Sequence, residues 1–418
     1  MNTPITLDEI LHPARIDAAR KKLIANNGCA GEDALSIREL DAALPHLWPA
    51  IEASIRNGTY QPAPLRPVPI PKPTGGIRRL AIPSVLDRLI QHAIAMTLTP
   101  PWERRFPPSS FAYRPGTGAQ PAISGILENA RLFEHPMALR IDIRDYFDRI
   151  SKASVDAVLR DTPCDSASST LIHRSLGAPL AGPLGPVIRD RGIPQGSPLS
   201  PLLSNAILLP FDLSFASAPA LLFRYADDML LLCADESTAR SMLARASESL
   251  AGLGLELNQA KTRLLPLGET SFLGFAFRQD ASGWHRDLSD NTRSSCIHHL
   301  RCMEDSGKSP TEMSTFLGQW AAYFLPDPGD RQRHAQFLRE TAATFQLPDT
   351  HPATRSSSPN GFSYDGHGRD QAYPRIPWAA RFFLRRVRFG LHFHRRGFIP
   401  IPSGIHINIA GHRIYFRF

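Results

Sequence analysis

Cysteine is scarce in this sequence: five thiols occur in 418 residues, and no two of them form a Cys-x-x-Cys pair. A disulfide framework and a zinc ribbon both need paired cysteines, so this spacing argues against both and favours a reducing compartment. Long apolar runs are missing too, since the uncharged stretch 197–211 is broken by three prolines. The N-terminus shows no apolar signal-peptide core. We therefore expect a soluble, cytoplasmic protein that has no membrane partner.

Acidic residues are absent from residues 378–418, a segment that holds eight arginines and no lysine. The net charge of +8 resides there, because the rest of the chain carries 39 basic and 39 acidic residues. Arginines interleaved with Phe, Tyr and His suit phosphate contact and base stacking. A solvated basic terminus, or one packed on an acidic face, is the alternative. The candidate nucleic-acid-binding residues are Arg381, Arg385, Arg386, Arg388, Arg395 and Arg396.

The length and the 42% hydrophobic content indicate two or three domains with a large core. Hydrophobic spacing and turn residues predict the order of elements along the chain. These are helices over 1–60, a β-hairpin over 61–85, a helix over 86–104, a strand over 138–147, a loop-rich stretch to about 195, one buried helix over 197–215, a hairpin over 221–233, a helix over 236–254, short strands over 255–277, two or three helices over 290–345, a linker over 346–377 and a final hairpin over 405–418.

Two adjacent carboxylates, Asp227 and Asp228, stand at the tip of the apolar hairpin over 221–233. Like charges this close repel each other, and a Mg²⁺ ion would relieve that cost. Alone, two aspartates are also ordinary turn residues. Asp142 interrupts an alternating strand, where the alternative is a residue facing solvent. If the two segments are neighbours in one sheet, three carboxylates converge as in a two-metal nucleotidyl-transfer site.

A loop bounded by glycine, Gly192-Ile193-Pro194-Gln195-Gly196, precedes the expected buried helix. Glycine allows the backbone to approach a ligand closely, and Gln195 could contact a nucleotide or a template. The alternative is an ordinary turn rich in Gly and Pro. The spacing of cysteine and histidine over 296–302 lies within a helical pattern, so we expect core thiols there and not a zinc site.

In this order, the segments resemble the sequence blocks of a reverse transcriptase, in particular the bacterial group II intron-like type. The segments are IPKPTGGIRRLAIP, FAYRPGTGAQPAI, RIDIRDYFDRI, GIPQGSPLSPLLSNAIL, FRYADDMLLL, LELNQAKT, TSFLGF and LGQWAAYF. The resemblance covers about residues 60–330. It implies an α+β fold, a right-hand polymerase with an antiparallel palm sheet, fingers and a helical thumb, plus a small basic C-terminal extension. The implied divisions are an N-terminal helical extension (1–60), fingers and palm (61–285), thumb (286–345), linker (346–377) and C-terminal extension (378–418).

The resemblance also implies roles for single residues around two Mg²⁺ ions, for which Mn²⁺ could substitute. Asp142, Asp227 and Asp228 would hold the ions, assisted by the main-chain carbonyl of Ile143. Lys261 would lie near the leaving pyrophosphate as a charge stabiliser or acid. Taken alone, Lys261 would be a surface lysine.

For the nucleotide and the primer, the resemblance implies a second set of residues. The triphosphate would pair with Lys72 and Arg78, and the incoming nucleotide and template would contact Gln195 and Gly196. Phe147 would be a steric gate that excludes a ribose 2′-OH, although alone it would be a core aromatic. The primer grip would be Phe272, Leu273 and Gly274.

The implied activity is RNA-directed DNA synthesis on a structured non-coding RNA, with dNTPs as substrates and DNA as product. A protein partner or a homo-oligomer remains open. The last 41 residues are too few for an RNase H domain, and no endonuclease module with paired cysteines is present. The Gln-Gly-Ser-Pro block and the lack of a retron-type element favour a free-standing enzyme of bacterial antiphage defence. The alternatives are an RNA-binding maturase or scaffold, and a polymerase making RNA or untemplated DNA.

Overall fold

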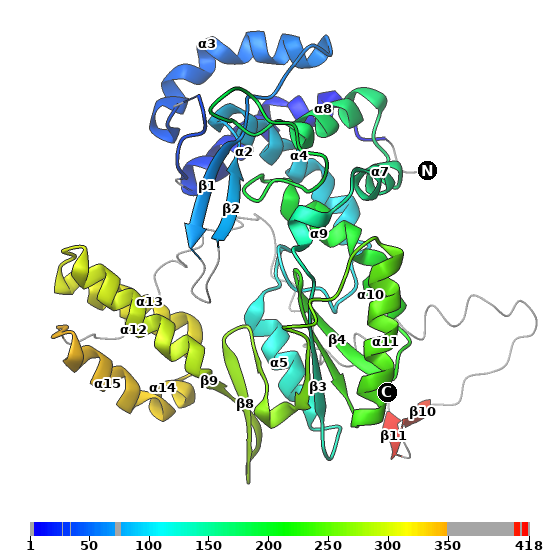
Figure 1. Cartoon of the computed structure of the whole chain (residues 1–418), viewed down its shortest axis with the longest axis vertical. Helices are drawn as coiled ribbons and strands as arrows, with labels where there is room; N and C mark the ends of the chain where they lie inside the picture. The colour runs from blue at the N-terminus through cyan, green and yellow to red at the C-terminus, as the bar shows by residue number, and fades with distance from the viewer. Residues whose placement is uncertain are drawn as a thin grey trace, which may run out of the picture. The chain divides into compact units, whose positions relative to one another are not determined.

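The fold is described from a computed structural model of the chain (Figure 1). It describes residues 4–26, 28–33, 35–71 and 77–348, and the backbone at 405–409 and 412–416. The chain divides into two compact units, residues 1–367 and 368–418. In the second unit, β10 (Ile405–Ile409) pairs antiparallel with β11 (His412–Phe416), which confirms the expected final hairpin. The six candidate arginines between 381 and 396, and nearly all of the expected linker, lie outside the described residues.

Helices form the N-terminal part of the first unit, as the sequence predicts. They are α1 (Leu7–Leu11), α2 (Pro13–Asn26), α3 (Ile37–Arg56) and, after a hairpin, α4 (Val85–Glu103). Capping boxes start α1 at Thr6 and α3 at Ser36, where a side chain accepts from the first free backbone N–H groups. Helix α4 is buried on most of its surface because α1, α2, α8 (Ser166–Gly177) and α9 (Ser200–Ile207) all contact it.

The expected hairpin over 61–85 is present as β1 (Arg66–Pro71) and β2 (Ile77–Ile82), paired from Arg66↔Ile82 to Pro71↔Ile77. The prolines of β1 occupy every second position, 67, 69 and 71. Their missing N–H groups therefore all lie along one edge of the strand. A two-stranded sheet has a free edge that tolerates this loss.

The largest sheet of the first unit, called the central sheet below, has four antiparallel strands in the order β4-β5-β3-β6. Its strands are β3 (Met137–Asp142), β4 (Ala220–Tyr225), β5 (Asp228–Cys233) and β6 (Arg263–Pro266). The central strand β5 is almost wholly apolar and buried, as the expected hairpin over 221–233 requires. Helix α11 (Glu236–Gly252) contacts all four strands, and α5 (Ala119–Ala130) contacts β4. The core therefore lies between this sheet and its helices.

Two expectations for the middle of the chain need correction. The stretch to about 195 is loop-rich only from residue 178 onward, because the part before it contains α6 (Tyr146–Arg149), α7 (Lys152–Arg160) and α8. Side chains of Ser151 and Asp165 cap α7 and α8, and helically spaced apolar residues bury one face of each.

The single buried helix expected over 197–215 is two helices, α9 and α10 (Leu209–Ser214). Pro210 explains the interruption. It has no N–H to continue the hydrogen bonds of α9 but fits the first turn of a new helix.

A second sheet, with the strand order β7-β8-β9, comes after the central sheet along the chain. A group of four helices comes after this second sheet. The strands are β7 (Ser271–Phe272), β8 (Phe275–Asp280) and β9 (Gly283–Leu288), and the helices are α12 (Asp290–Asp305), α13 (Pro310–Phe324), α14 (Pro328–Arg333) and α15 (Ala335–Thr344). The described residues thus form four helices where two or three were expected. Pro328 starts α14 after a break, and the capping box of Ser309 and Glu312 starts α13 as expected. No helix in the described part of the chain is both long and apolar enough to cross a membrane.

Candidate active site

The pairing of β3 with β5 brings the three candidate aspartates to one end of the central sheet. Asp142, the last residue of β3, is the register partner of Asp228, the first residue of β5. Asp227 lies in the two-residue turn between β4 and β5. The first residue of that turn, Ala226, has a φ of 57°, a left-handed conformation that costs a non-glycine residue about 1 kcal/mol or more. The neighbouring structure must therefore hold this turn.

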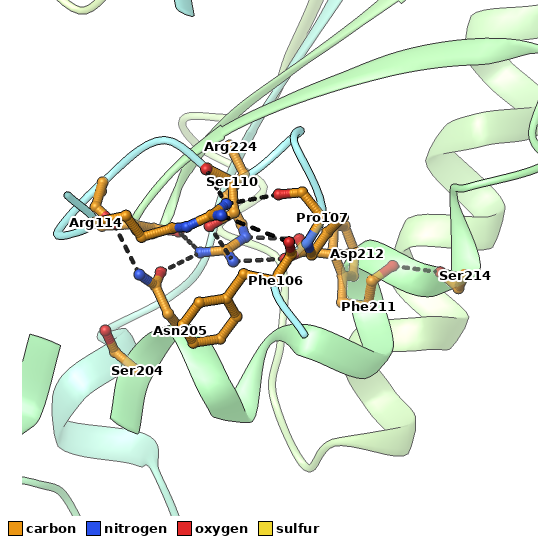
Figure 2. A network of polar contacts seen from close by, with 12 residues as sticks. Phe106, Pro107, Ser110, Arg114, Ser204, Asn205, Phe211, Asp212, Ser214 and Arg224 are labelled. Atoms are coloured by element: carbon orange, nitrogen blue, oxygen red, sulfur yellow. Dashed lines mark hydrogen bonds and ion pairs between the residues drawn. The ribbon is translucent and has the colours of Figure 1, made fainter. Parts of the chain in front are cut away.

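Arg224 supports the turn from inside the protein, and Figure 2 shows its polar contacts with Ser110, Asn205 and Asp212. It donates to the carbonyl of Ala226 at 3.2 Å, and its own side chain has no exposed surface. Both carboxylate oxygens of Asp212 accept from it, at 2.6 and 2.5 Å. Asn205 and Ser110 each accept at 2.8 Å. The sequence analysis did not predict this network. Its signal was that Arg224 and Asp212 are single charged residues within apolar runs, where a buried charge needs a partner.

Asp142 is held by residues that follow β5 in the chain. Asn258 donates its side-chain amide to Asp142 Oδ2 at 2.8 Å, and its backbone N–H to the Asp142 carbonyl at 2.8 Å. Lys261 Nζ lies 3.6 Å from Asp142 Oδ1, on a side chain that is 63% exposed. Ile143 is buried and forms an isolated bridge with Leu257. Lys261 and Ile143 are thus brought to the carboxylates, as the implied roles require.

Burial and neighbouring charges change the pKa values of the two adjacent aspartates, Asp227 and Asp228. Burial raises the pKa of Asp227, and the negative charges of Asp142 and Asp228 raise it further. Burial also raises the pKa of Asp228, and Arg140 opposes that shift. Arg140 Nη2 lies 2.8 and 3.1 Å from the two Asp228 oxygens. Arg140 was missed at the sequence level, although it precedes Asp142 by two residues and must share its face of β3.

The residues suit a divalent cation by their chemistry but are not gathered around one point. In the part of the chain that the structure describes, no three His, Cys, Asp or Glu side chains are arranged to hold a metal ion. In the structure, Arg140 bonds to both oxygens of Asp228, and Asn258 bonds to one oxygen of Asp142. Clustered carboxylates with raised pKa values remain the hard oxygen donors that Mg²⁺ prefers.

Residues from the β1–β2 hairpin and the glycine loop form a second part of the site. Arg78, exposed on β2, is close enough that its charge lowers the pKa of Asp227 against the larger effect of burial. The carbonyl of Gln195 accepts from Ala81 N–H at 2.8 Å. Gly196 has a φ of 129°, and a Cβ there would lie 3.1 Å from the Ala81 carbonyl oxygen. The loop is therefore joined to β2, and glycine is required where it lies against that strand.

Phe147 and Lys72 complete the sequence-based candidates for the nucleotide. Phe147 is half-buried on α6, with its ring edge-on to Tyr146 at a centroid distance of 5.4 Å. Its carbonyl accepts from Ile193 N–H at 2.9 Å, so its backbone is fixed to the glycine loop. Lys72 lies outside the described residues.

The turn over Phe272, Leu273 and Gly274 lies beside Asp228. These three residues line a cavity of about 470 Å³ together with Asp228 and Arg140. Helices α12 and α13 supply other wall residues, which are Asn291, Thr292, Ser295, Cys296, His299, Phe316, Trp320 and Phe324. The turn is tight, since Leu273 has a φ of 51° and the Gly274 carbonyl accepts from Thr292 Oγ1 at 2.6 Å. The candidate primer grip and Asp228 therefore share one cavity.

Of the two thiols over 296–302 that were expected in the core, Cys296 is buried and Cys302 is exposed. Cys296 is buried among Leu300, Met313 and Leu317, where burial raises the pKa of its thiol to about 12. Cys302 and His298 contact each other on the exposed face of α12, at 3.6 Å. A thiol in an apolar core behaves as a small hydrophobic residue.

An antiparallel sheet with aspartates at the ends of adjacent strands, helices against it and a grip turn beside it defines the palm of a right-hand polymerase. The family model described as "Reverse transcriptase (RNA-dependent DNA polymerase)" matches residues 70–277. Residues 70–277 of this chain therefore form a domain of the reverse transcriptase family.

Three relatives show the type of reverse transcriptase that this chain resembles. It is 29% identical over 211 residues to Protein YkfC of Escherichia coli strain K12. It is 30% identical over 207 residues to the group II intron-encoded protein LtrA of Lactococcus lactis subsp. cremoris. It is 28% identical over 216 residues to the retron Mx65 reverse transcriptase of Myxococcus xanthus. These matches support a bacterial, group II-like reverse transcriptase.

The matched segments cover only part of this chain and only part of each relative. The matches cover 49%, 49% and 47% of this chain, in the order YkfC, LtrA and the retron enzyme. They cover 55%, 34% and 46% of those three relatives. The chain thus spans about half the length, or less, of these curated relatives.

Proposed function

We propose that this protein is an RNA-directed DNA polymerase, which adds dNTPs to a primer by attack of a 3′-hydroxyl on the α-phosphate and releases pyrophosphate. The observation that carries the proposal is the register pair Asp142↔Asp228, with Asp227 in the adjoining turn. This pairing collects carboxylates from two segments of the chain, both of which lie within the residues that match the family. The family membership supports an RNA template and dNTP substrates.

Two Mg²⁺ ions, or Mn²⁺ in their place, would be held by Asp142, Asp227, Asp228 and the carbonyl of Ile143. Such ions, when bound, activate the attacking oxygen and neutralise charge on the phosphates. The protein's own part is electrostatic and positional. Arg224 fixes the turn that aims Asp227, and Asn258 orients Asp142. Lys261, 3.6 Å from Asp142, carries a charge that would stabilise the departing pyrophosphate.

The nucleotide would be bound between the sheet and the β1–β2 hairpin. Arg78 and Lys72 would pair with the triphosphate, and Gln195 and Gly196 would contact the base pair that forms. Phe147 is fixed to the glycine loop by its backbone, so its ring would lie where a ribose 2′-OH must be excluded. Phe272, Leu273 and Gly274 would support the primer end in the cavity next to Asp228.

The test uses purified protein, with the nucleic acid that copurifies with it sequenced. Labelled dNTPs and Mg²⁺ are added to the wild type and to Asp227→Ala plus Asp228→Ala. Asp305→Ala, at the exposed end of α12, is the control for the loss of a carboxylate. We expect label in DNA copied from one bound RNA, in the wild type and the control alone. Incorporation that persists in the double variant would contradict the proposal.

Two alternatives predict different results in the same experiment. An RNA-binding maturase or scaffold would retain a specific RNA while no variant incorporates label, even when partners and primers are supplied. A polymerase making untemplated DNA would incorporate label into sequences unrelated to the bound RNA. The intact carboxylates, in a partly buried site where their charges repel, favour an active enzyme.

We further propose a structured non-coding RNA as template and a free-standing role in bacterial antiphage defence. The arginine- and aromatic-rich segment 378–418 supports an RNA partner of this kind. Expression of the protein with its adjacent non-coding sequence is expected to reduce phage plating, and Asp227→Ala plus Asp228→Ala is expected to remove that protection. Equal plating with both proteins would refute the defence role and leave polymerase activity intact.

A further inference from the structure

Arg140 occupies the carboxylate that the proposed function assigns to a metal ion. Its Nη2 group bonds to both oxygens of Asp228, at 2.8 and 3.1 Å. Arg140 lies on β3, two residues before Asp142 and on the same face of the strand. A positive side chain therefore occupies both oxygens of Asp228, the register partner of Asp142, and no three His, Cys, Asp or Glu side chains of the described residues are arranged to hold a metal ion.

Arg140 also belongs to the wall of the cavity that holds the grip turn. It lines this space of about 470 Å³ together with Asp228 and residues 271–274. Its guanidinium carbon lies 5.8 Å from the centre of the Phe272 ring. Its Nε atom is buried and has no hydrogen-bond partner among the described residues. The guanidinium thus retains an unused donor, and it borders a space large enough for a nucleic-acid backbone.

The contact between Arg140 and Asp228 can be exchanged at low cost. Both side chains are 33% exposed, and ion pairs of that exposure contribute only about 1 kcal/mol. A phosphate offers a guanidinium the same planar, two-oxygen partner that a carboxylate does. A divalent cation and Arg140 need the same Asp228 oxygens, so binding of one opposes binding of the other.

We propose that Arg140 is an internal cation that holds Asp228 until a nucleic-acid phosphate enters the cavity and draws it away. Nucleic acid thereby increases the affinity of the three aspartates for a divalent cation. This inference rests on the proposed function and adds an order of binding to it. Linkage requires that the divalent cation strengthen nucleic-acid binding by the same factor. Arg140 is a positioning residue in this scheme, because it acts through Asp228.

The test measures Mn²⁺ binding by the electron paramagnetic resonance signal of free Mn²⁺, with no catalysis involved. The probe is an RNA–DNA hybrid whose primer ends in a dideoxynucleotide, so that no bond can form. The proteins are the wild type, Arg140→Gln, Arg140→Lys and Arg263→Gln. Arg263 is the matched control, because it is the exposed register partner of Arg140 on β6 and bonds only to the Gln259 and Thr262 carbonyls among the contacts described.

We expect the hybrid to tighten Mn²⁺ binding to the wild type by about fivefold or more, the factor that corresponds to about 1 kcal/mol. Arg140→Gln should bind Mn²⁺ about fivefold more tightly without the hybrid and gain little when the hybrid is added. Arg140→Lys should keep part of the gain, because it keeps the charge but not the planar donor. Arg263→Gln should match the wild type in both states.

Several results would overturn the inference. Equal Mn²⁺ affinity of Arg140→Gln and the wild type without the hybrid shows that Arg140 does not compete for Asp228. If the hybrid increases the Mn²⁺ affinity of Arg140→Gln as much as that of the wild type, Arg140 does not compete for Asp228 either. If either result appears while the wild type still incorporates dNTPs, the role of Arg140 is refuted and the polymerase proposal is retained. If the wild type neither binds Mn²⁺ in any state nor incorporates dNTPs, the proposed function fails first.

Discussion

Arg224 and Asp212 form an ion pair in which neither side chain has any exposed surface. The pair joins β4 to α10 and, through the Ala226 carbonyl, supports the turn that carries Asp227. A buried pair is no guarantee of stability, because desolvation offsets much of its attraction. Breaking such a pair is costly, however, since one charge is then left buried without a partner.

Arg224→Leu is therefore expected to lower the free energy of unfolding by about 3–5 kcal/mol. Arg224→Lys keeps the charge but cannot reach Asp212, Asn205 and Ser110 together, so we expect an intermediate loss. Arg240→Ala, in the exposed pair with Glu236, is the control and should cost less than 1 kcal/mol. Urea unfolding measures all three variants. A loss below 1 kcal/mol for Arg224→Leu would show that the pair does not hold the turn.

Asp227→Asn should abolish incorporation of dNTPs yet stabilise the metal-free protein. Burial and the neighbouring aspartates raise the folded-state pKa of Asp227 above its unfolded value. Ionisation therefore favours the unfolded chain, and the resulting loss of stability appears as the pH rises above the ordinary pKa of aspartate. We expect Asn to raise the free energy of unfolding at pH 7 and to lower incorporation at least 100-fold. Thermal unfolding without metal should show no gain at pH 3; a gain there of equal size would contradict the electrostatic cause.

Gly274→Ala should damage the grip turn. Gly274 has a φ of 87°, and a Cβ there would lie 2.9 Å from Phe324 Cε1 and from Thr292 Oγ1. We expect a loss of about 1–3 kcal/mol in unfolding free energy and weaker binding of a primer–template hybrid, measured by fluorescence anisotropy. Gly268→Ala is the control, because its Cβ would meet Trp284 only at 3.8 Å. Unchanged stability and binding in Gly274→Ala would show that the turn adjusts freely.

His92 should make the stability fall in mild acid. Burial lowers the pKa of His92 to about 4, and the charges of Lys22 and Arg88 add to this effect. The unfolded chain takes up the proton near pH 6.5 and the folded chain only near pH 4, so stability is lost as the pH falls between these values. Between pH 7 and pH 5 we expect His92 to account for about 2 kcal/mol of the loss.

The measurement for His92 is urea unfolding at pH 7 and pH 5. His92→Gln should remove most of the difference between the two pH values, whereas His135→Gln, at an exposed side chain, should leave it unchanged. If His92→Gln and the wild type lose the same stability between pH 7 and pH 5, another group is responsible.

Phe147→Ala should reduce the discrimination between deoxyribose and ribose. Exclusion by shape alone is worth about 10–100-fold, so we expect the preference for dNTPs over rNTPs to fall by that factor. Single-nucleotide incorporation with dCTP and CTP at matched concentrations measures this ratio. Phe147→Tyr keeps a ring of the same width and should keep the preference. An unchanged ratio in Phe147→Ala would remove the steric-gate argument.

Much of the local structure follows from the sequence. Capping residues such as Ser309 with Glu312, and alternation such as that of 221–233, predict elements that the structure confirms. The family was also recognisable from motif order, and the match over residues 70–277 confirms it. Prediction failed at α7 and α8, whose short apolar faces were hidden among polar residues, and at Pro210, which restarts a helix. Short helices give weak periodic signals, so their stability comes from tertiary packing.

The sequence by itself determined which residue types the site contains, because spacing along one strand or turn fixes which side chains share a face. Only the tertiary structure decided their partners. Arg140 and Asp228 are 88 residues apart, and Asn258 is 116 residues from Asp142. These contacts exist because β3 lies between β5 and β6, an order set by burial of the whole sheet and not by local preference.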